Sequence, residues 1–133
     1  MSEYASDLWR RACRALATAS RNIEAADPDA AASRAYYAAF YAVSALFALE
    51  SRDFAKHSAV EAAVHRELVR TGRWPPELGE NYRSLRDLRA TGDYGHLDHV
   101  TPKAAQDAVD MARRILEAVQ QACPELIDLT DKP

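Results

Sequence analysis

The sequence has few glycines, few prolines and two cysteines, and each shortage excludes a class of protein. Its 133 residues contain 4 glycines and 6 prolines, which argues against a turn-rich all-β sandwich. The cysteines, Cys13 and Cys123, are far apart and belong to no CxxC or Cys/His cluster. We therefore expect no metal site and no cofactor, and we interpret the cysteines as buried free thiols of a reducing cytosol.

Long hydrophobic runs are also missing, and we expect no cleavable leader. The longest apolar stretch, residues 35–49, contains tyrosines and a serine and falls short of the roughly 20 residues that a membrane-spanning helix needs. The first residues, MSEYASDLWRR, include early acidic side chains and no apolar segment of the signal-peptide type. We expect a soluble, cytoplasmic protein with no membrane association.

Positive charge is not in excess. The chain has 17 basic and 20 acidic residues, a net charge of −3 and a pI near 5.8. This balance excludes a broadly cationic nucleic-acid-binding surface but leaves room for a local basic patch. The length is typical of one domain, which argues against a multidomain enzyme. We assign residues 1–123 to this domain and residues 124–133 to a short acidic tail.

What the sequence has in quantity is alanine, together with apolar side chains at the three- and four-residue spacing of amphipathic helices. It predicts five helices, at about 4–26, 28–51, 58–70, from 76 onward, and 102–123. The expected fold is an all-α, up-and-down bundle of four to five helices.

Four positions are predicted to mark helix ends. Asp27 and Thr101 each precede a proline, and aspartate or threonine can cap a helix whose first turn accommodates proline. Gly92 and Gly95 predict that the fourth helix gives way to a loop over residues 90–100. Such a loop exceeds the roughly 2–8 residues usual between bundle helices, and long loops often carry function.

Three groups of residues have side chains suited to chemistry. The first is four aromatic residues in the second helix, Tyr36, Tyr37, Phe40 and Tyr41, beside Arg34. They form either a stacking surface for bases or part of the bundle core. Their helical spacing in so apolar a segment favours the core.

The second group follows that helix, where Arg52 and His57 are separated by four residues. An arginine and a histidine close together can neutralise a phosphate and transfer a proton. The alternative interpretation is a solvated turn between helices, with His57 near the start of the next one.

The third group runs from Arg89 through Asp93 and Tyr94 to His96, with His99 three residues further on. An arginine suited to phosphate is followed here by a carboxylate, a phenol and an imidazole. In a continuous helix, residues 89 and 96 would share a face. The alternative is an ordered loop held by capping through Asp93 and packing of Tyr94.

Taken together, these segments resemble the HEPN domain family, in particular its small stand-alone prokaryotic branch. The resemblance rests on residues 33–41 (SRAYYAAFY), 56–58 (KHS), 71–72 (TG) and 88–95 (LRATGDYG), and extends over about residues 30–118. It implies a helical bundle, often a two-fold homodimer, and association with nucleotide or RNA. It also implies pairing with a small nucleotidyltransferase as a toxin–antitoxin system.

Ribonucleases of this family are recognised by an arginine, four to six residues and then a histidine. Arg89 and His96 have six residues between them, so the resemblance implies that Arg89 holds the scissile phosphate and His96 transfers a proton. Asp93 would orient His96, and Tyr94 would donate to phosphate. The chain departs from the pattern in having Ala90 where a polar residue is usual, and in having tyrosine rather than histidine at the shorter spacing.

Three hypotheses follow. The first is a HEPN binding module, the partner of a nucleotidyltransferase, that contacts nucleotide or RNA through Arg34, Tyr37, Arg52 and His57. The second is a metal-independent endoribonuclease toxin that uses Arg89 and His96, with Arg52 and His57 as a second match to the family spacing. The third is a helical dimer with a purely structural role.

Overall fold

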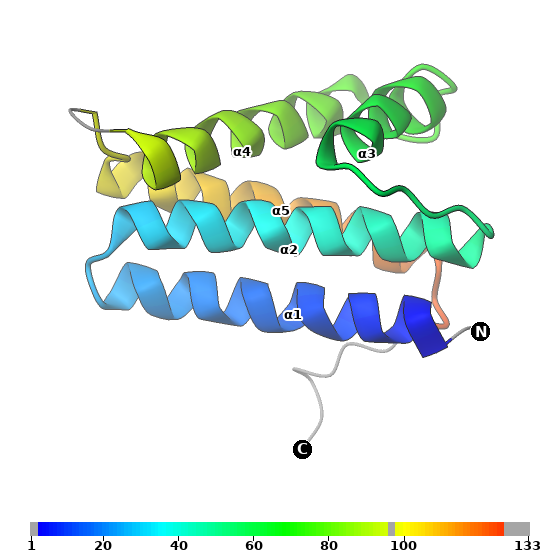
Figure 1. Ribbon diagram of the computed structural model, residues 1–133, viewed down its shortest axis with the longest axis horizontal. Coiled ribbons are helices and arrows are strands. Elements are labelled where there is room, and N and C mark those ends of the chain that lie inside the picture. The colour runs from blue at the N-terminus through cyan, green and yellow to red at the C-terminus, as the bar shows by residue number, and fades with distance from the viewer. Residues whose placement is uncertain (1–2, 96–97, 127–133) are drawn as a thin grey trace.

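The computed structural model of the protein describes residues 3–95 and 98–126. Over this part of the chain it contains helices and no strand, which confirms the prediction of an all-α bundle. The elements, in order, are α1 (Glu3–Glu24), α2 (Pro28–Leu49), α3 (His57–Ala63), the π-helical segment η1 (Val64–Val69), α4 (Pro76–Tyr94) and α5 (Pro102–Ala122). Figure 1 shows α1 and α2 side by side, α4 along the other side of α2, and α5 behind it.

Helix α2 is the centre of the bundle, as its apolar sequence predicts. It contacts α1, α4 and α5, and the short α3 at one end. Many of its buried residues are alanines, which let neighbouring helices approach closely because their side chains are small. The alanines buried in α2 are Ala31, Ala32, Ala35, Ala38, Ala39, Ala42 and Ala45.

Both predicted helix starts are confirmed. The Asp27 carboxylate accepts a hydrogen bond from the Ala30 backbone N–H at 3.2 Å, and Pro28 occupies the first turn of α2. The Thr101 hydroxyl accepts one from Ala104 at 3.1 Å at the start of α5. Each bond satisfies a backbone donor that has no partner within the helix.

Helix α4 continues to Tyr94, so the predicted loop begins at residue 95 rather than 90. Gly92 lies inside the helix, where a Cβ atom would come within 2.8 Å of the Asp29 carbonyl oxygen in α2. Glycine is therefore required for the close approach of α4 to α2 and does not end the helix. Val100, just before α5, is bound to α2 because the Asp29 carboxylate accepts a hydrogen bond from its backbone N–H at 2.8 Å.

The third predicted helix changes type halfway. Residues 57–63 are α-helical, whereas residues 64–69 form a π-helix that the apolar spacing does not reveal. The Trp74 backbone N–H donates to the Leu68 carbonyl at 2.8 Å, which fixes the turn after this segment. Against its side packs Gly79 of α4, where a Cβ would lie 2.7 Å from the Val69 side chain. Close helix packing thus explains this glycine too.

The core is continuous from α1 to α5. Cys13 and Cys123 are buried in it, as predicted. Within residues 3–95 and 98–126, every helix is too short or too polar to pass through a lipid bilayer. The largest fully buried side chains are Tyr82, Phe47, Leu46, Leu68, Leu85, Ile115 and Leu126.

Candidate functional site

Arg89, near the end of α4, is held by residues from two helices. Its Nε donates to the Asp93 carboxylate at 3.0 Å, one helical turn later. Its Nη2 donates to the Tyr37 hydroxyl of α2 at 2.9 Å and to the Tyr94 hydroxyl at 3.5 Å. The guanidinium carbon lies 5.5 Å from the ring centre of Tyr36, 5.3 Å from that of Tyr37 and 5.5 Å from that of Tyr94. Hydrogen bonds and cation–π contacts therefore fix its orientation.

The Arg89 guanidinium stays charged and keeps one nitrogen available. Burial works to lower its pKa, but Tyr37, Tyr94 and Asp93 together raise the pKa above the ordinary arginine value. Its side chain is 22% exposed. Among the residues that the structure describes, none accepts a hydrogen bond from its Nη1. A partly desolvated arginine with free donors is suited to an anion such as phosphate.

The aromatic residues of α2 divide between the core and the surface of the bundle. Tyr36 is buried, 2% exposed, and burial raises the pKa of its hydroxyl. Tyr37, Phe40 and Tyr41 are half-buried and pack against the core from outside. Tyr36 thus packs in the core beneath the site, while Tyr37, Phe40 and Tyr41 expose part of their rings at its edge.

His57 opens α3 beside these rings. Its ring centre lies 4.1 Å from that of Phe40, in a stacked arrangement, and its Nδ1 forms a hydrogen bond of 3.2 Å with the Tyr36 hydroxyl. Burial lowers the pKa of His57, and the positive charge of Arg89 lowers it further. The imidazole is therefore mainly neutral at pH 7, since even its ordinary pKa is near 6.5.

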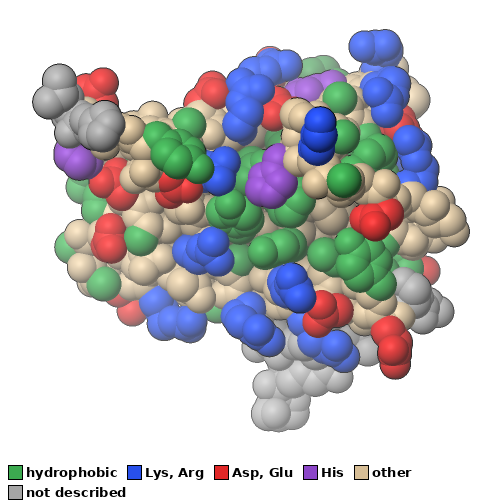
Figure 2. All heavy atoms as spheres, viewed as in Figure 1, with side chains coloured by type: hydrophobic (Ala, Val, Ile, Leu, Met, Phe, Trp, Pro, Cys, Tyr) green, Lys and Arg blue, Asp and Glu red, His purple; other side chains and the backbone are tan. Residues whose placement is uncertain are grey.

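Arg34 extends the site along α2. Its guanidinium carbon lies 4.8 Å from the ring centre of Tyr37, the same ring that Arg89 contacts. We call this group of residues the arginine–tyrosine surface. Its members are Arg34, Tyr36, Tyr37, Phe40, His57, Arg89, Asp93 and Tyr94. Figure 2 shows hydrophobic side chains gathered over α2 on this face, with basic side chains over α1 beside them.

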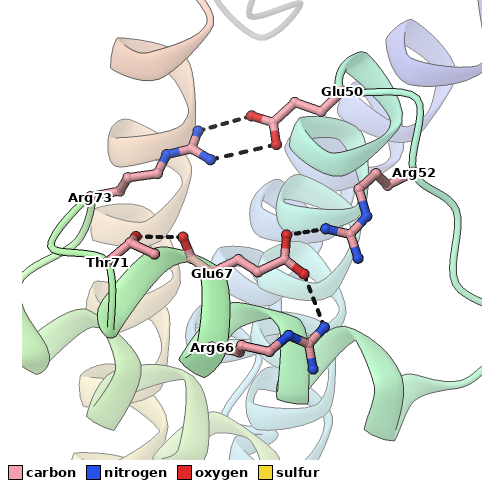
Figure 3. A network of polar contacts seen from close by, with 6 residues as sticks. All are labelled: Glu50, Arg52, Arg66, Glu67, Thr71 and Arg73. Atoms are coloured by element: carbon pink, nitrogen blue, oxygen red, sulfur yellow. Dashed lines mark hydrogen bonds and ion pairs between the residues drawn. The ribbon is translucent and has the colours of Figure 1, made fainter.

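Arg52 lies elsewhere, at the opposite end of α2 from Arg34. Its guanidinium pairs with the Glu67 carboxylate, which also binds Arg66 at 2.9 Å (Figure 3). In the same region, Arg73 pairs with Glu50 at 2.9 Å. The structure thus gives Arg52 a carboxylate partner, and among the described residues no contact joins it to His57.

The remaining sequence-predicted residues have different outcomes. Asp93 contacts Arg89, and Tyr94 lies beside the same guanidinium with 66% of its surface exposed. His96 lies outside the described residues. His99 pairs with Asp29 at 2.9 Å, near the start of α2. Arg89 and His57, a histidine from a different sequence group, lie beside the same two rings, those of Tyr36 and Tyr37.

Sequence reasoning missed the contact between His57 and Phe40 and the hydrogen bond from Arg89 to Tyr37. Tyr36 and Phe40 are four residues apart, which places them on one face of α2. That spacing predicts aromatic rings aligned on one face of α2, but it does not show which side chains of other helices contact them. The partners lie 52 positions away for Arg89 and Tyr37, and 17 for Phe40 and His57.

The arrangement suits anion binding, base stacking and proton transfer. Arg89 supplies donors for phosphate, the exposed ring of Tyr94 offers a stacking face, and neutral His57 can accept a proton. In the described part of the chain, no three His, Cys, Asp or Glu residues gather as metal ligands would.

Comparisons with known proteins agree with the fold. The chain is 37% identical over 121 residues to a UPF0332 protein of Thermotoga maritima, covering 90% of this chain and 92% of that protein. It is 28% identical over 122 residues to the UPF0332 protein glr0978 of Gloeobacter violaceus, covering 91% and 97%. The crystal structure of TT1696 from Thermus thermophilus superposes with a TM-score of 0.78 at 23% identity, covering 90% and 98%, and shows the same fold.

The family model for the HEPN domain matches residues 5–122, which is nearly the whole described chain. This match confirms the resemblance drawn from the motifs in α2, α3 and α4. The chain therefore belongs to the HEPN domain family.

Proposed function

We propose that this protein binds nucleotide or single-stranded RNA through the arginine–tyrosine surface. The observation that carries the proposal is the geometry of Arg89. Tyr37 and Asp93 fix its guanidinium at 2.9 and 3.0 Å, while its Nη1 has no acceptor among the described residues. A guanidinium already oriented by neighbours loses less entropy on binding a phosphate than a free side chain does.

The surrounding groups suit a nucleotide better than a simple anion. Tyr94 is 66% exposed beside Arg89, and Tyr37 is half-buried under both Arg34 and Arg89. Stacking of a base on an exposed aromatic ring contributes roughly 1–3 kcal/mol without requiring a particular sequence. Since every base has an aromatic face that can stack, we expect the protein to bind RNA with little preference among the bases.

Equilibrium binding tests this proposal directly. Fluorescence anisotropy with a labelled single-stranded RNA should give saturable binding, and Arg89→Ala should weaken it about tenfold or more. Arg113→Ala on α5 is the matched control, because it removes the same charge from a side chain paired with Asp110. Equal affinities for wild type and Arg89→Ala would contradict the proposal.

The proposal includes a partner and a second copy of the chain. Family membership and the Arg89, Asp93 and Tyr94 pattern support pairing with a small nucleotidyltransferase as a toxin–antitoxin system. A two-fold homodimer would bring two copies of Arg89 and His57 to one cleft, which a single chain does not supply. Light scattering tests the dimer, and a monomer at all concentrations would contradict it. Co-purification with a nucleotidyltransferase encoded by a neighbouring gene tests the pairing.

A second candidate function is metal-independent RNA cleavage, and it is favoured because His57 and Arg89 both lie beside the rings of Tyr36 and Tyr37. Neutral His57 would take the proton of a ribose 2′-hydroxyl, whose oxygen attacks the phosphorus while Arg89 stabilises the phosphate charge. The bond to the 5′ oxygen breaks, that oxygen takes a proton from water, and a 2′,3′-cyclic phosphate forms. In this scheme His57, from α3, takes the role that the family spacing gives to His96.

Cleavage assays in chelator separate the two candidates. A ribonuclease should yield cyclic-phosphate ends, and Arg89→Ala should abolish them. Loss of cleavage in His57→Ala but not in His96→Ala would identify His57 as the proton-transfer group, and the reverse would identify His96. Binding without cleavage would support a module that binds RNA or nucleotide. The absence of both binding and cleavage would support a structural dimer.

A further inference from the structure

A second group of arginines lies beside the arginine–tyrosine surface, between α1 and α2. It lines a hollow of about 350 Å³. The residues around the hollow are Arg11, Arg14, Ala15, Thr18, Arg34 and Tyr41. The sequence places the α1 arginines off the apolar stripe of that helix, and the structure brings two of them to Arg34 of α2.

Positive charge in the hollow is only partly compensated. Arg11 pairs with Asp7 at 3.1 Å. Within the described part of the chain, neither Arg14 nor Arg34 has a carboxylate within ion-pair distance. In a chain of net charge −3, three guanidinium groups facing one hollow form a local positive field. An anion would relieve their mutual repulsion.

Polar and aromatic groups complete the hollow. The Thr18 hydroxyl already accepts a hydrogen bond from Arg21 at 3.1 Å, which adds a further arginine to the same side of α1. The Arg11 guanidinium lies 6.0 Å from the ring centre of Tyr41. The hollow thus combines cationic donors with a ring face, the two features that nucleic-acid backbones and bases need.

The hollow is continuous with the arginine–tyrosine surface. Arg34 lines the hollow and also covers the Tyr37 ring that Arg89 contacts. Tyr41 lies 6.0 Å from Tyr37, ring centre to ring centre. Figure 2 shows the basic side chains over α1 running alongside the hydrophobic area over α2. One extended ligand can therefore reach both groups of arginines.

We infer that the hollow is a second phosphate site, which binds the backbone of a single-stranded RNA whose neighbouring phosphate occupies Arg89. This inference rests on the proposed function and specifies it, since it makes the ligand an oligonucleotide rather than a mononucleotide. A single nucleotide would occupy one group of arginines, whereas an oligonucleotide would occupy both. The two groups of arginines then form a short track across α1, α2 and α4.

The test compares two lengths of RNA on the full chain. Anisotropy is measured with a labelled dinucleotide and with a longer single-stranded RNA, for wild type, Arg11→Ala/Arg14→Ala and the control Arg113→Ala. The double variant should weaken binding of the longer RNA about tenfold or more and leave dinucleotide affinity unchanged. Its salt dependence should also be shallower by about 0.7 in log–log slope, since the hollow binds one phosphate and each single-strand phosphate contact contributes about 0.7.

The outcomes distinguish this inference from the proposed function. If the double variant binds the longer RNA like wild type while Arg89→Ala does not, the hollow is not a phosphate site and the proposed function stands. If wild type binds neither RNA, this inference and the proposed function are both contradicted. The expected ligand of the arginines would then be an acidic protein. Thermal unfolding controls for folding, because alanine at exposed helix positions preserves α1.

Discussion

The Nη2 of Arg89 donates a hydrogen bond of 2.9 Å to the Tyr37 hydroxyl, joining α4 to α2 across 52 positions of sequence. The same tyrosine ring lies 4.8 Å from Arg34. One half-buried side chain thus orients one arginine through its hydroxyl and supports another through its ring face. The site depends on this shared contact rather than on a contiguous motif.

Replacing Tyr37 by phenylalanine tests this relationship. Tyr37→Phe removes the acceptor for Arg89 but keeps the ring, so we expect a loss of about 1 kcal/mol in the free energy of unfolding. RNA affinity should fall severalfold because Arg89 loses its fixed orientation. Chemical denaturation and anisotropy measure the two effects. Tyr94→Phe is the control, since its longer contact of 3.5 Å should contribute less, and a larger effect there would contradict this account.

The stability of the protein should depend on pH through His57. Burial, and then Arg89, lower its pKa in the folded state, whereas the unfolded chain keeps a value near 6.5. Below about pH 6.5 the unfolded state binds the proton more readily, so stability is lost as the pH falls towards the folded-state pKa. His57→Gln should flatten this loss in urea titrations between pH 7 and 5. A parallel decline in wild type and variant would show that His57 is not responsible.

Gly92→Ala should destabilise the protein, although glycine to alanine within a helix ordinarily stabilises by about 1 kcal/mol. The added Cβ would lie 2.8 Å from the Asp29 carbonyl oxygen and 3.3 Å from its Cα. Separating α4 from α2 to relieve this clash should cost about 1–3 kcal/mol. Ala90→Gly, at an exposed position of the same helix, measures the propensity contribution alone. Increased stability of Gly92→Ala would mean that the two helices are not so close.

Arg52→Ala should leave RNA affinity unchanged, because the Arg52 guanidinium is bound by Glu67 at the far end of α2 from Arg34. Its side chain is 40% exposed, so the lost ion pair should cost under about 1 kcal/mol. Anisotropy, with Arg89→Ala measured in parallel, gives the RNA affinity, and thermal unfolding gives the loss of stability. A loss of affinity comparable to that of Arg89→Ala would place Arg52 in the binding surface.

The bundle could be predicted from the sequence because its signals are local. Asp27 and Thr101 cap their helices through bonds to residues three positions away, and the apolar spacing of α1 and α5 needs no knowledge of neighbours. The same local rules gave the wrong boundary at Gly92. There the requirement for glycine comes from Asp29, a residue distant in sequence, whereas the local pattern predicts the end of a helix.

The site could be predicted only as separate pieces. Arg89, Asp93 and Tyr94 fall within one turn and a half of α4, so their grouping follows from helix geometry. The meeting of Arg89 with Tyr37 and His57 depends on how α4, α2 and α3 pack. Spacing alone paired Arg52 with His57, and the structure instead pairs Arg52 with Glu67. Tertiary packing decides which arginine joins the histidine.

The most direct test of the account is a nuclear magnetic resonance titration of the isotope-labelled protein with single-stranded RNA. The account predicts saturable shift changes centred on Tyr37, His57 and Arg89, extending to Arg34, with none at Arg113 of α5, which pairs with Asp110. The Arg89→Ala variant should lose them while keeping its dispersed spectrum. Unchanged spectra with excess RNA, or changes centred away from the arginine–tyrosine surface, would contradict the claim that this surface binds RNA.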